Sequence, residues 1–281
     1  MNGAAPPRRI WLCADDYGLS DGVNRAILAL IERGRLNATS VMLVTPAIGR
    51  DAAAALQAAA GKSPRCAIGL HVTLTAPFRP LTLHFRPLDG DMFLPFPKLL
   101  RRGLLRRLDA ELVHAEVLAQ VDAFKDLFGR APDFVDGHQH VQLFPQVRDG
   151  FLRAVKERAA DAWVRQGGGN LKLAERLAAP KALVLDTLSA QFRSKAARLG
   201  LRFNPAFAGA YDFTRAADFG ALMRQFLDGL PEDGLVMCHP GFVDETLKSL
   251  DPLTTQRETE YGYLASEDFA GLLALNNVTL A

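Results

Sequence analysis

Short apolar runs alternate with amphipathic helical segments along the chain, and this order constrains the fold more than any other feature of the sequence. We expect strands over Ile10–Ala14, Ala38–Val44, Cys66–Leu70, Phe134–Val135, Ala162–Arg165 and Gly234–Cys238. We expect helices over Gly22–Arg33, Asp51–Ala60, Asp109–Phe128, Gln146–Ala160, Lys181–Leu199 and Ala217–Leu230. This order predicts an α/β fold with a mainly parallel sheet. A chain of 281 residues fits one barrel-like domain, so we expect residues 1–281 to form a single domain.

Charge and cysteine content narrow the class of protein. The formal net charge of +2 is too small to indicate nucleic-acid binding by itself, and we expect none. The three cysteines are odd in number and lack a CxxC spacing, so they predict neither a disulfide framework nor a zinc knuckle. Reduced thiols and the lack of a recognisable signal sequence favour a cytoplasmic protein. No run reaches 18 uninterrupted apolar residues, so we expect no membrane-spanning helix.

Polar side chains gather where the predicted strands end. These residues are Asp15, Asp16, His71, His138, His140, Arg165 and His239. Functional sites of parallel α/β sheets and barrels are built at the carboxyl ends of the strands. The spacing therefore predicts that these side chains share one site.

One aspartate and two imidazoles from three strand ends suit a divalent metal with positions left open for water and substrate. Such a metal polarises a carbonyl and lowers the pKa of its water. A second carboxylate beside it can act as general base, and a histidine on the far side can protonate a leaving group. One acid of Asp15–Asp16 would then hold the metal, while the other acts on the water. Neighbouring side chains of a strand point to opposite faces, so the strand must break at this pair, in agreement with the nearby Gly18.

A structural interpretation of the same residues stays open at this point. Two adjacent acids before a helix also occur near a helix N-cap, with Ser20 or Asp21 as the capping residue. A single histidine at a strand end is more often structural than a ligand. Asn24 and Thr39 or Ser40 could hold the loop that carries the two acids. Asn24 also fits a first helical turn and Ser40 a core strand, and we prefer this structural interpretation.

Five motifs, taken in order, resemble the YdjC-type carbohydrate deacetylases, a group that includes chitooligosaccharide and hopanoid-associated deacetylases. They are ADDYGLSDGVN, TSVMLV, IGLHVTLT, FVDGHQHVQLFPQV and VMCHPGFVD, and they extend from about Ile10 to about Asp244. The resemblance implies a distorted TIM-like α/β barrel related to that of NodB-type deacetylases. It also implies hydrolysis of the acetamide of an N-acetylated sugar with one divalent metal ion, magnesium or zinc.

The same resemblance implies a metal site made by Asp16, His71 and His138. Many relatives carry a further histidine where this chain has Gln142, so that side chain has no assigned role here.

The resemblance also assigns catalytic roles. Asp15 would be the general base, and His239 would be the general acid for the departing amine. Arg165 corresponds to an arginine that orients the catalytic acid, although its surroundings match less clearly. His140 would lie behind the ligands or face the substrate.

The stretch from 77 to about 107 is expected to be an irregular insertion that forms a wall or lid of the site. It is rich in proline up to Pro97, and Lys98–Leu108 is basic and amphipathic. The basic part either contacts an anionic membrane, if the substrate is a lipid-linked sugar, or is the solvated face of a helix packed on the core. The sequence does not decide the oligomeric state.

Two other functions fit the residues less well. A hydrolase of an ester or phosphoester remains an alternative, but a phosphoester site would need a basic cluster, and the motifs supply only Arg165. An inactive sugar-binding barrel is the second alternative. Such a protein would usually have lost Asp15 or His239, and both are present.

Overall fold

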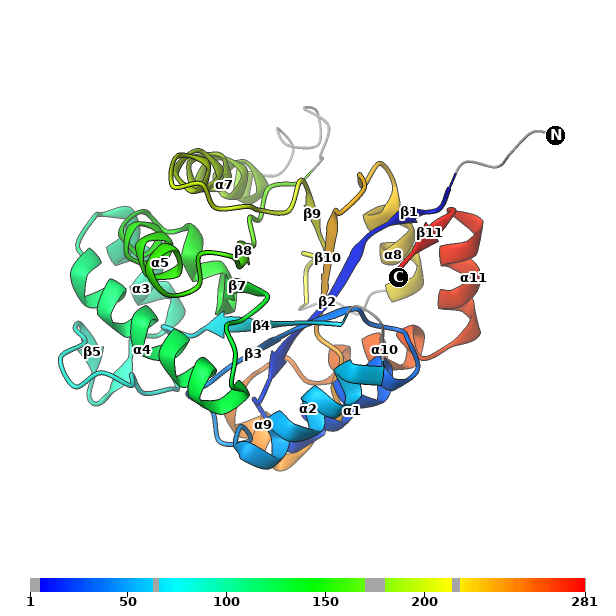
Figure 1. Ribbon diagram of the computed structural model, residues 1–281, viewed down its shortest axis with the longest axis horizontal. Coiled ribbons are helices and arrows are strands. Elements are labelled where there is room, and N and C mark those ends of the chain that lie inside the picture. The colour runs from blue at the N-terminus through cyan, green and yellow to red at the C-terminus, as the bar shows by residue number, and fades with distance from the viewer. Residues whose placement is uncertain (1–5, 63–65, 170–179, 214–217, 281) are drawn as a thin grey trace.

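The molecule is built on one curled sheet of seven parallel strands that forms a half-barrel, with the helices around its outside (Figure 1). The computed structural model describes residues 6–62, 66–169, 180–213 and 218–280. In spatial order the strands are β8 (Trp163–Val164), β7 (Phe134–Gly137), β4 (Ala67–Val72), β3 (Ala38–Val41), β2 (Trp11–Tyr17), β10 (Leu235–Cys238) and β9 (Phe207–Ala208). All pairings in this sheet are parallel, which confirms the predicted α/β fold.

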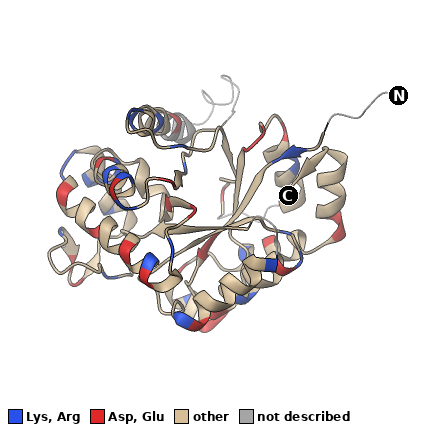
Figure 2. Cartoon of the chain, in the orientation of Figure 1, with Lys and Arg blue, Asp and Glu red and all other residues tan. Residues whose placement is uncertain are grey.

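All six predicted helices are present, with shifts of a few residues at their ends. They are α1 (Asp21–Glu32), α2 (Arg50–Lys62), α4 (Ala110–Phe128), α5 (Pro145–Arg158), α7 (Pro180–Arg198) and α8 (Phe219–Leu227). Ser20 caps α1 by accepting from the Val23 N–H, and Asp109 caps α4 in the same way. Gly129 ends α4 in the left-handed conformation that glycine adopts at low cost. Figure 2 shows charged residues mainly on these outer helices, while the strands are mostly uncharged.

Two predicted strand ends are wrong in a way that bears on the site. β2 continues through Asp15 and Asp16 to Tyr17, and β4 includes His71. The expected break in β2 is a bulge, because its register against β3 shifts between Ala14 and Tyr17. Asp16 has a φ of 72° at this bulge, which lets neighbouring side chains depart from strict alternation.

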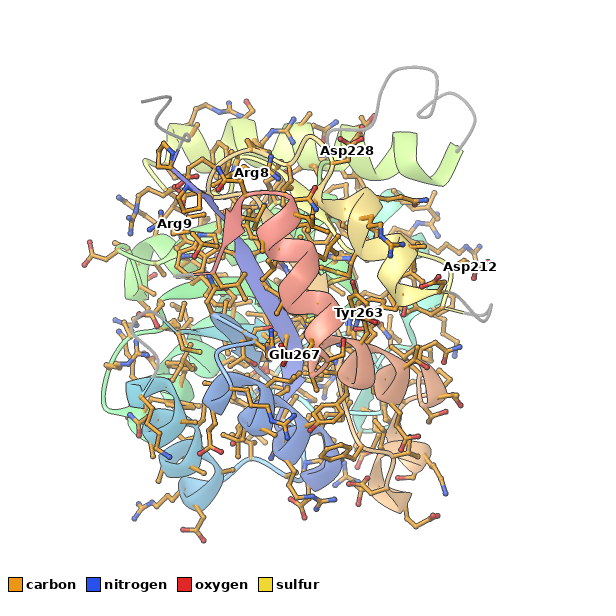
Figure 3. All side chains as sticks on the ribbon, turned by 90° about the vertical axis from the view of Figure 1, so that its right-hand side faces the viewer. Arg8, Arg9, Asp212, Asp228, Tyr263 and Glu267 are labelled. Carbon is orange, nitrogen blue, oxygen red and sulfur yellow. The ribbon has the colours of Figure 1, made fainter. Side chains whose placement is uncertain are left out.

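The C-terminal part of the chain forms elements that the sequence did not predict. They are α9 (Glu245–Leu250), α10 (Thr255–Leu264), α11 (Glu267–Leu275) and β11 (Val278–Thr279), which pairs with β1 (Arg8–Arg9). Figure 3 shows this side of the molecule, with Arg8 and Arg9 marking β1 and Glu267 marking the start of α11. The pairing of β1 with β11 joins residues 8–9 to residues 278–279, and α10 is linked to β2 by the hydrogen bond from Arg257 to Asp16.

The segment from 77 to 107 is less irregular than expected. It contains a short antiparallel pair, β5 (Leu88–Asp89) and β6 (Met92–Phe93), and then helix α3 (Phe96–Leu104). Leu99 and Gly103 are buried on the inner side of α3. A Cβ added at Gly103 would lie 3.2 Å from Phe144 Cβ, so a small residue allows this close approach.

Candidate metal and catalytic site

A carboxylate and two imidazoles converge at the carboxyl ends of β2, β4 and β7. His71 Nε2 lies 3.3 Å and His138 Nδ1 lies 3.1 Å from Asp16 Oδ1. One ligand atom from each of these residues lies within 4.8 Å of the other two. Asp16 reaches this position at the bulge, and His138 is the first residue after β7, in the 3-10 segment η1 (His138–Leu143). The donor set is the mixture of nitrogen and oxygen atoms that Zn²⁺ and related divalent ions accept, so the residues fit such an ion.

Asp136 supports this set from behind. It is the Cα partner of His71 across the β4–β7 pair, and its Oδ1 lies 2.6 Å from His71 Nδ1. This contact holds the Nδ1 proton of His71 and leaves Nε2 directed at Asp16, as in metal sites where a carboxylate orients a histidine ligand. Burial lowers the pKa of His71, but the negative charges of Asp136 and Asp15 raise it to about 10. The same negative potential favours a bound cation.

Asp15 is held by a fully buried guanidinium. Arg165 donates from both terminal nitrogens to the two carboxylate oxygens of Asp15, each at 2.7 Å, and also lies 3.1 Å from Asp136 Oδ2. Ser40 Oγ donates to Asp15 Oδ1 at 3.2 Å. Burial raises the pKa of Asp15, but Arg165 and His71 outweigh it and bring the pKa well below its ordinary value. Asp15 is therefore an oriented, ionised carboxylate, and Asp15 Oδ2 lies 3.9 Å from His71 Nε2.

Arg257 plays the corresponding part for Asp16. Its Nη2 donates to Asp16 Oδ2 at 2.6 Å and to Asp251 Oδ2 at 2.7 Å. The other oxygen of Asp16 faces the two histidines. Burial raises the pKa of Asp16, and Arg257 with His138 brings it well below its ordinary value. Each acid of the pair is thus fixed by its own arginine, and neither caps α1, because Ser20 does so.

His239 and His140 lie at the edge of the same cluster. The ring of His239 lies edge-on to Phe213, and its backbone N–H donates to Glu260 Oε2 at 2.5 Å. Burial lowers the pKa of His239 to about 4, so its ring is neutral at pH 7. Burial and the charge of Arg165 lower the pKa of His140 to about 3, and its ring lies against Phe207.

Buried polar atoms without a protein partner gather near the cluster, among the described residues. They include His239 Nδ1, His140 Nδ1, Gln142 Oε1 and Arg257 Nη1. Buried polar atoms are normally satisfied, so such a concentration indicates a place for water, an ion or polar substrate groups. Gln142 also donates to the Arg165 carbonyl at 3.2 Å.

Sequence reasoning missed four members of the site. Asp136 lies two positions before His138 in the DGHQH motif, and an acid so close to a predicted ligand was the available signal. Ser40, expected to be structural, contacts both Asp15 and His71. Arg257 and Glu260 lie on α10, where polar residues in a helix ordinarily indicate a solvated face.

Asn24 was expected to be structural, and it fixes the turn after the two acids. Its side-chain oxygen accepts from the Gly18 N–H at 2.6 Å, and its amide donates to the Ala47 carbonyl at 2.8 Å. These two bonds hold the loop between β2 and α1 without any contact to the ligands.

A second group of possible ligands does not fit a metal. Cys13, Asp15 and Asp136 lie close together, but the guanidinium of Arg165 already occupies the position of a cation here, 2.7 Å from Asp15 Oδ1 and 3.1 Å from Asp136 Oδ2. Burial, and then the negative charge of Asp15, raise the pKa of the Cys13 thiol well above its ordinary value. Cys13 and Cys238 are buried, and Cys66 is half-buried.

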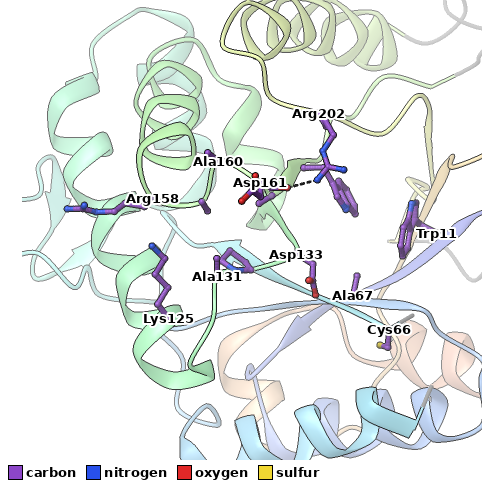
Figure 4. A pocket seen from close by; sticks show the side chains of 14 residues that line it. Trp11, Cys66, Ala67, Lys125, Ala131, Asp133, Arg158, Ala160, Asp161 and Arg202 are labelled. Carbon is purple, nitrogen blue, oxygen red and sulfur yellow. Dashed lines mark hydrogen bonds between the residues drawn. The ribbon is translucent and has the colours of Figure 1, made fainter. Parts of the chain in front are cut away.

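A cavity of about 630 Å³ lies at the opposite ends of the strands (Figure 4). Trp11 and Trp163, which begin β2 and β8, line it with Arg202 and Asp133. Sites in barrels of this kind are built at the carboxyl ends, whereas this cavity opens at the amino ends. The cavity is therefore separate from the cluster of acids and histidines.

The sequence and the fold both have known relatives. A family model described as YdjC-like protein matches residues 9–275, beyond Asp244, where the quoted motifs end. Chitooligosaccharide deacetylases of Escherichia fergusonii and Citrobacter koseri are each 30% identical over 249 residues, covering 84% of this chain and 82% of the relative.

Solved structures with low sequence identity share the fold. A candidate cellobiose-phosphate cleavage protein of Enterococcus faecalis aligns with a TM-score of 0.76 at 19% identity, covering 98% of this chain and 97% of that one. A lactam utilization protein of Thermus thermophilus aligns with a TM-score of 0.51 at 15% identity, covering 97% and 98%. At these identities the likeness shows the fold alone. Within the described residues, no helix is both long enough and apolar enough to cross a bilayer.

Proposed function

Since the chain belongs to the YdjC-like protein family, we propose that it is a metal-dependent hydrolase that removes the N-acetyl group from an N-acetylated amino sugar. One observation carries this proposal: Asp16, His71 and His138 converge, and an oriented carboxylate, Asp15, stands beside them. The names of the two chitooligosaccharide deacetylases support a sugar acetamide as the bond that is cleaved.

Asp16, His71 and His138 would hold one divalent ion, with magnesium and zinc as the first candidates. When bound, the ion supplies Lewis acidity toward the acetamide carbonyl and toward water. Asp136 keeps the proton of His71 on Nδ1, and Arg257 keeps one oxygen of Asp16 turned toward the histidines.

Asp15 would take the proton of the attacking water as general base. Arg165 fixes its orientation and keeps it ionised well below neutral pH, so a base is present whenever substrate binds. His239 would donate a proton to the departing amine. Because its ring is neutral at pH 7, that proton must reach it during the reaction, and the proton taken up by Asp15 is the source within the site.

His140 would lie behind the ligands or face the substrate, as a neutral imidazole against the ring of Phe207. The segment from 77 to 107 would form a wall of the site, since the ring of Phe78 lies edge-on to the ring of His138, with centroids 6.3 Å apart. A phosphoester substrate is not favoured, because both guanidinium groups near the ligands, Arg165 and Arg257, are already paired with carboxylates.

The proposal includes a single catalytic domain in the cytoplasm. The core cluster includes residues from Ile10 to Val278, which supports one folding unit. Three free cysteines support a reducing compartment.

The test is release of acetate from a panel of substrates, with and without chelator. The panel runs from free N-acetylglucosamine through chitobiose to a lipid-linked N-acetylglucosamine, with an acetate ester and a phosphate ester of the same sugars as controls. We expect acetate only from acetamides, loss of activity in chelator and recovery with added divalent ion. Full turnover after exhaustive chelation, or faster cleavage of the phosphate ester, would show that the proposal is wrong.

A further inference from the structure

The exposed large apolar side chains are concentrated in one segment. Among the described residues these side chains are Leu81, Leu83, Met92, Leu104, Leu105 and Leu275. Five of the six lie between positions 81 and 105, so they are not scattered as single exposed apolar residues usually are. Leu83 is 87% exposed. A local concentration of this kind on the surface of a folded domain usually marks a contact surface.

Within this segment, helix α3 and strand β5 lie close together in space. Lys98 on α3 is ion-paired with Asp89 on β5, with Nζ and Oδ2 2.6 Å apart. Figure 1 shows α3 and β5 on the same side of the molecule. We call the exposed face of residues 79–107 the α3–β5 surface.

The loop before β5 is held firmly. The buried carboxylate of Glu116 accepts from the backbone N–H groups of Leu81 and Thr82, at 3.0 and 2.9 Å. The apolar side chain of Leu81 is therefore presented to the solvent by a fixed backbone.

The α3–β5 surface is strongly basic. Residues 79–107 contain seven lysines and arginines and two aspartates, a net charge of +5, whereas the whole chain has +2. Both aspartates are already paired, Asp91 with Arg79 and Asp89 with Lys98. Four exposed arginines near the end of α3 have no carboxylate partner in the part of the chain that the structure describes: Arg101, Arg102, Arg106 and Arg107.

Leucines between unpaired arginines fit one kind of partner best. An anionic bilayer offers phosphate groups to the guanidinium groups and a hydrocarbon boundary to the leucines at the same depth. A nucleic acid or an acidic protein surface would match the arginines but would leave Leu104 and Leu105 in water. We propose that the α3–β5 surface docks the protein on an anionic membrane.

This docking would place the candidate site next to the lipid headgroups. The α3–β5 surface begins directly after Phe78, whose ring lies edge-on to the ring of His138, and this part of the chain follows β4, which carries His71. An N-acetylated sugar carried by a lipid could then reach the site without leaving the membrane. That last step depends on the proposed function, whereas the docking does not.

The test measures co-sedimentation of the full chain with vesicles. One set is phosphatidylcholine alone, and the other contains phosphatidylglycerol. We expect binding to the anionic vesicles at low salt, and weaker binding at high salt as the charges are screened. L104S/L105S and R101Q/R102Q/R106Q/R107Q should each weaken this binding by at least about tenfold, since each side chain contributes separately. Circular dichroism checks that each variant folds.

Matched controls separate this surface from general effects of charge and apolarity. L275S changes the sixth exposed apolar side chain, and R25Q/R33Q/R50Q/R224Q removes four exposed arginines elsewhere. Both should bind like the wild type. The proposal fails if the anionic vesicles do not bind at low salt, if the controls lose binding equally, or if only the arginine variant loses it. Vesicle binding needs no turnover, so its failure is distinct from failure of the deacetylase proposal.

Discussion

The variants Asp15→Asn and Asp16→Asn should lose activity for different reasons. The two positions are adjacent, buried and similarly supported, so each variant is the matched control of the other. Asp15 is paired with Arg165, and Asp16 is paired with Arg257. Asparagine keeps the size of either side chain and removes only its charge and basicity.

The structure limits the damage to the fold. Leaving a buried charge without any partner costs about 3–5 kcal/mol. In Asp15→Asn, however, Arg165 retains Asp136 at 3.1 Å, and in Asp16→Asn, Arg257 retains Asp251 at 2.7 Å. We therefore expect each variant to lose less than that amount of unfolding free energy and to remain folded at room temperature.

The functional effects should separate. Asp15→Asn removes the general base, so turnover should fall by roughly 10²–10⁴, which corresponds to about 3–5 kcal/mol in the barrier, while bound metal stays near the wild-type level. Asp16→Asn removes a charged ligand. Replacing a residue that only supports a ligand lowers metal affinity by roughly 10–100-fold, so loss of the ligand itself should lower it further. Excess metal should partly restore its rate.

The assay measures metal content and acetate release on the same samples, with urea unfolding to check stability. Loss of metal in Asp15→Asn and its retention in Asp16→Asn would mean that the two roles are reversed. If neither metal content nor rate changes in either variant, the acids have no catalytic role and the mechanism is wrong.

Three further predictions concern the site. Removal of metal by a chelator should abolish acetate release. The rates restored by different added divalent ions would then rank those ions as cofactors. An unchanged rate after chelation would exclude the metal site. His239→Ala should keep its metal and lose turnover by roughly 10²–10⁴, and loss of metal instead would assign it as a ligand. Burial raises the pKa of Glu260 to about 7, so its neutral form stabilises the fold at low pH and this contribution is lost as pH rises from about 4.5 through 7. In Glu260→Gln, the free energy of unfolding by urea should no longer fall by about 3 kcal/mol over this pH range. An unchanged pH dependence would contradict the raised pKa of Glu260.

The sequence by itself determined the fold class and most of the residues of the candidate cluster. Alternating apolar strands and amphipathic helices are local patterns, and a parallel sheet follows from their order. The carboxyl ends of its strands lie at one edge, so Asp15, His71 and His138 could be brought together without knowing the packing. Strand geometry also predicted that the strand must break at the two acids, and the bulge at Asp16 is that break.

The tertiary structure alone decided which groups hold these residues in place. Arg257 is 241 positions from Asp16, and its contact depends on how α10 packs beside the sheet. Helical periodicity cannot show that packing, because a polar residue on a helix is usually solvated. Asp136 is opposite His71 only because the register of β7 against β4 places it there. The sequence indicated the donor atoms, but register and long-range packing fixed their orientation, because both depend on contacts between segments far apart in the chain.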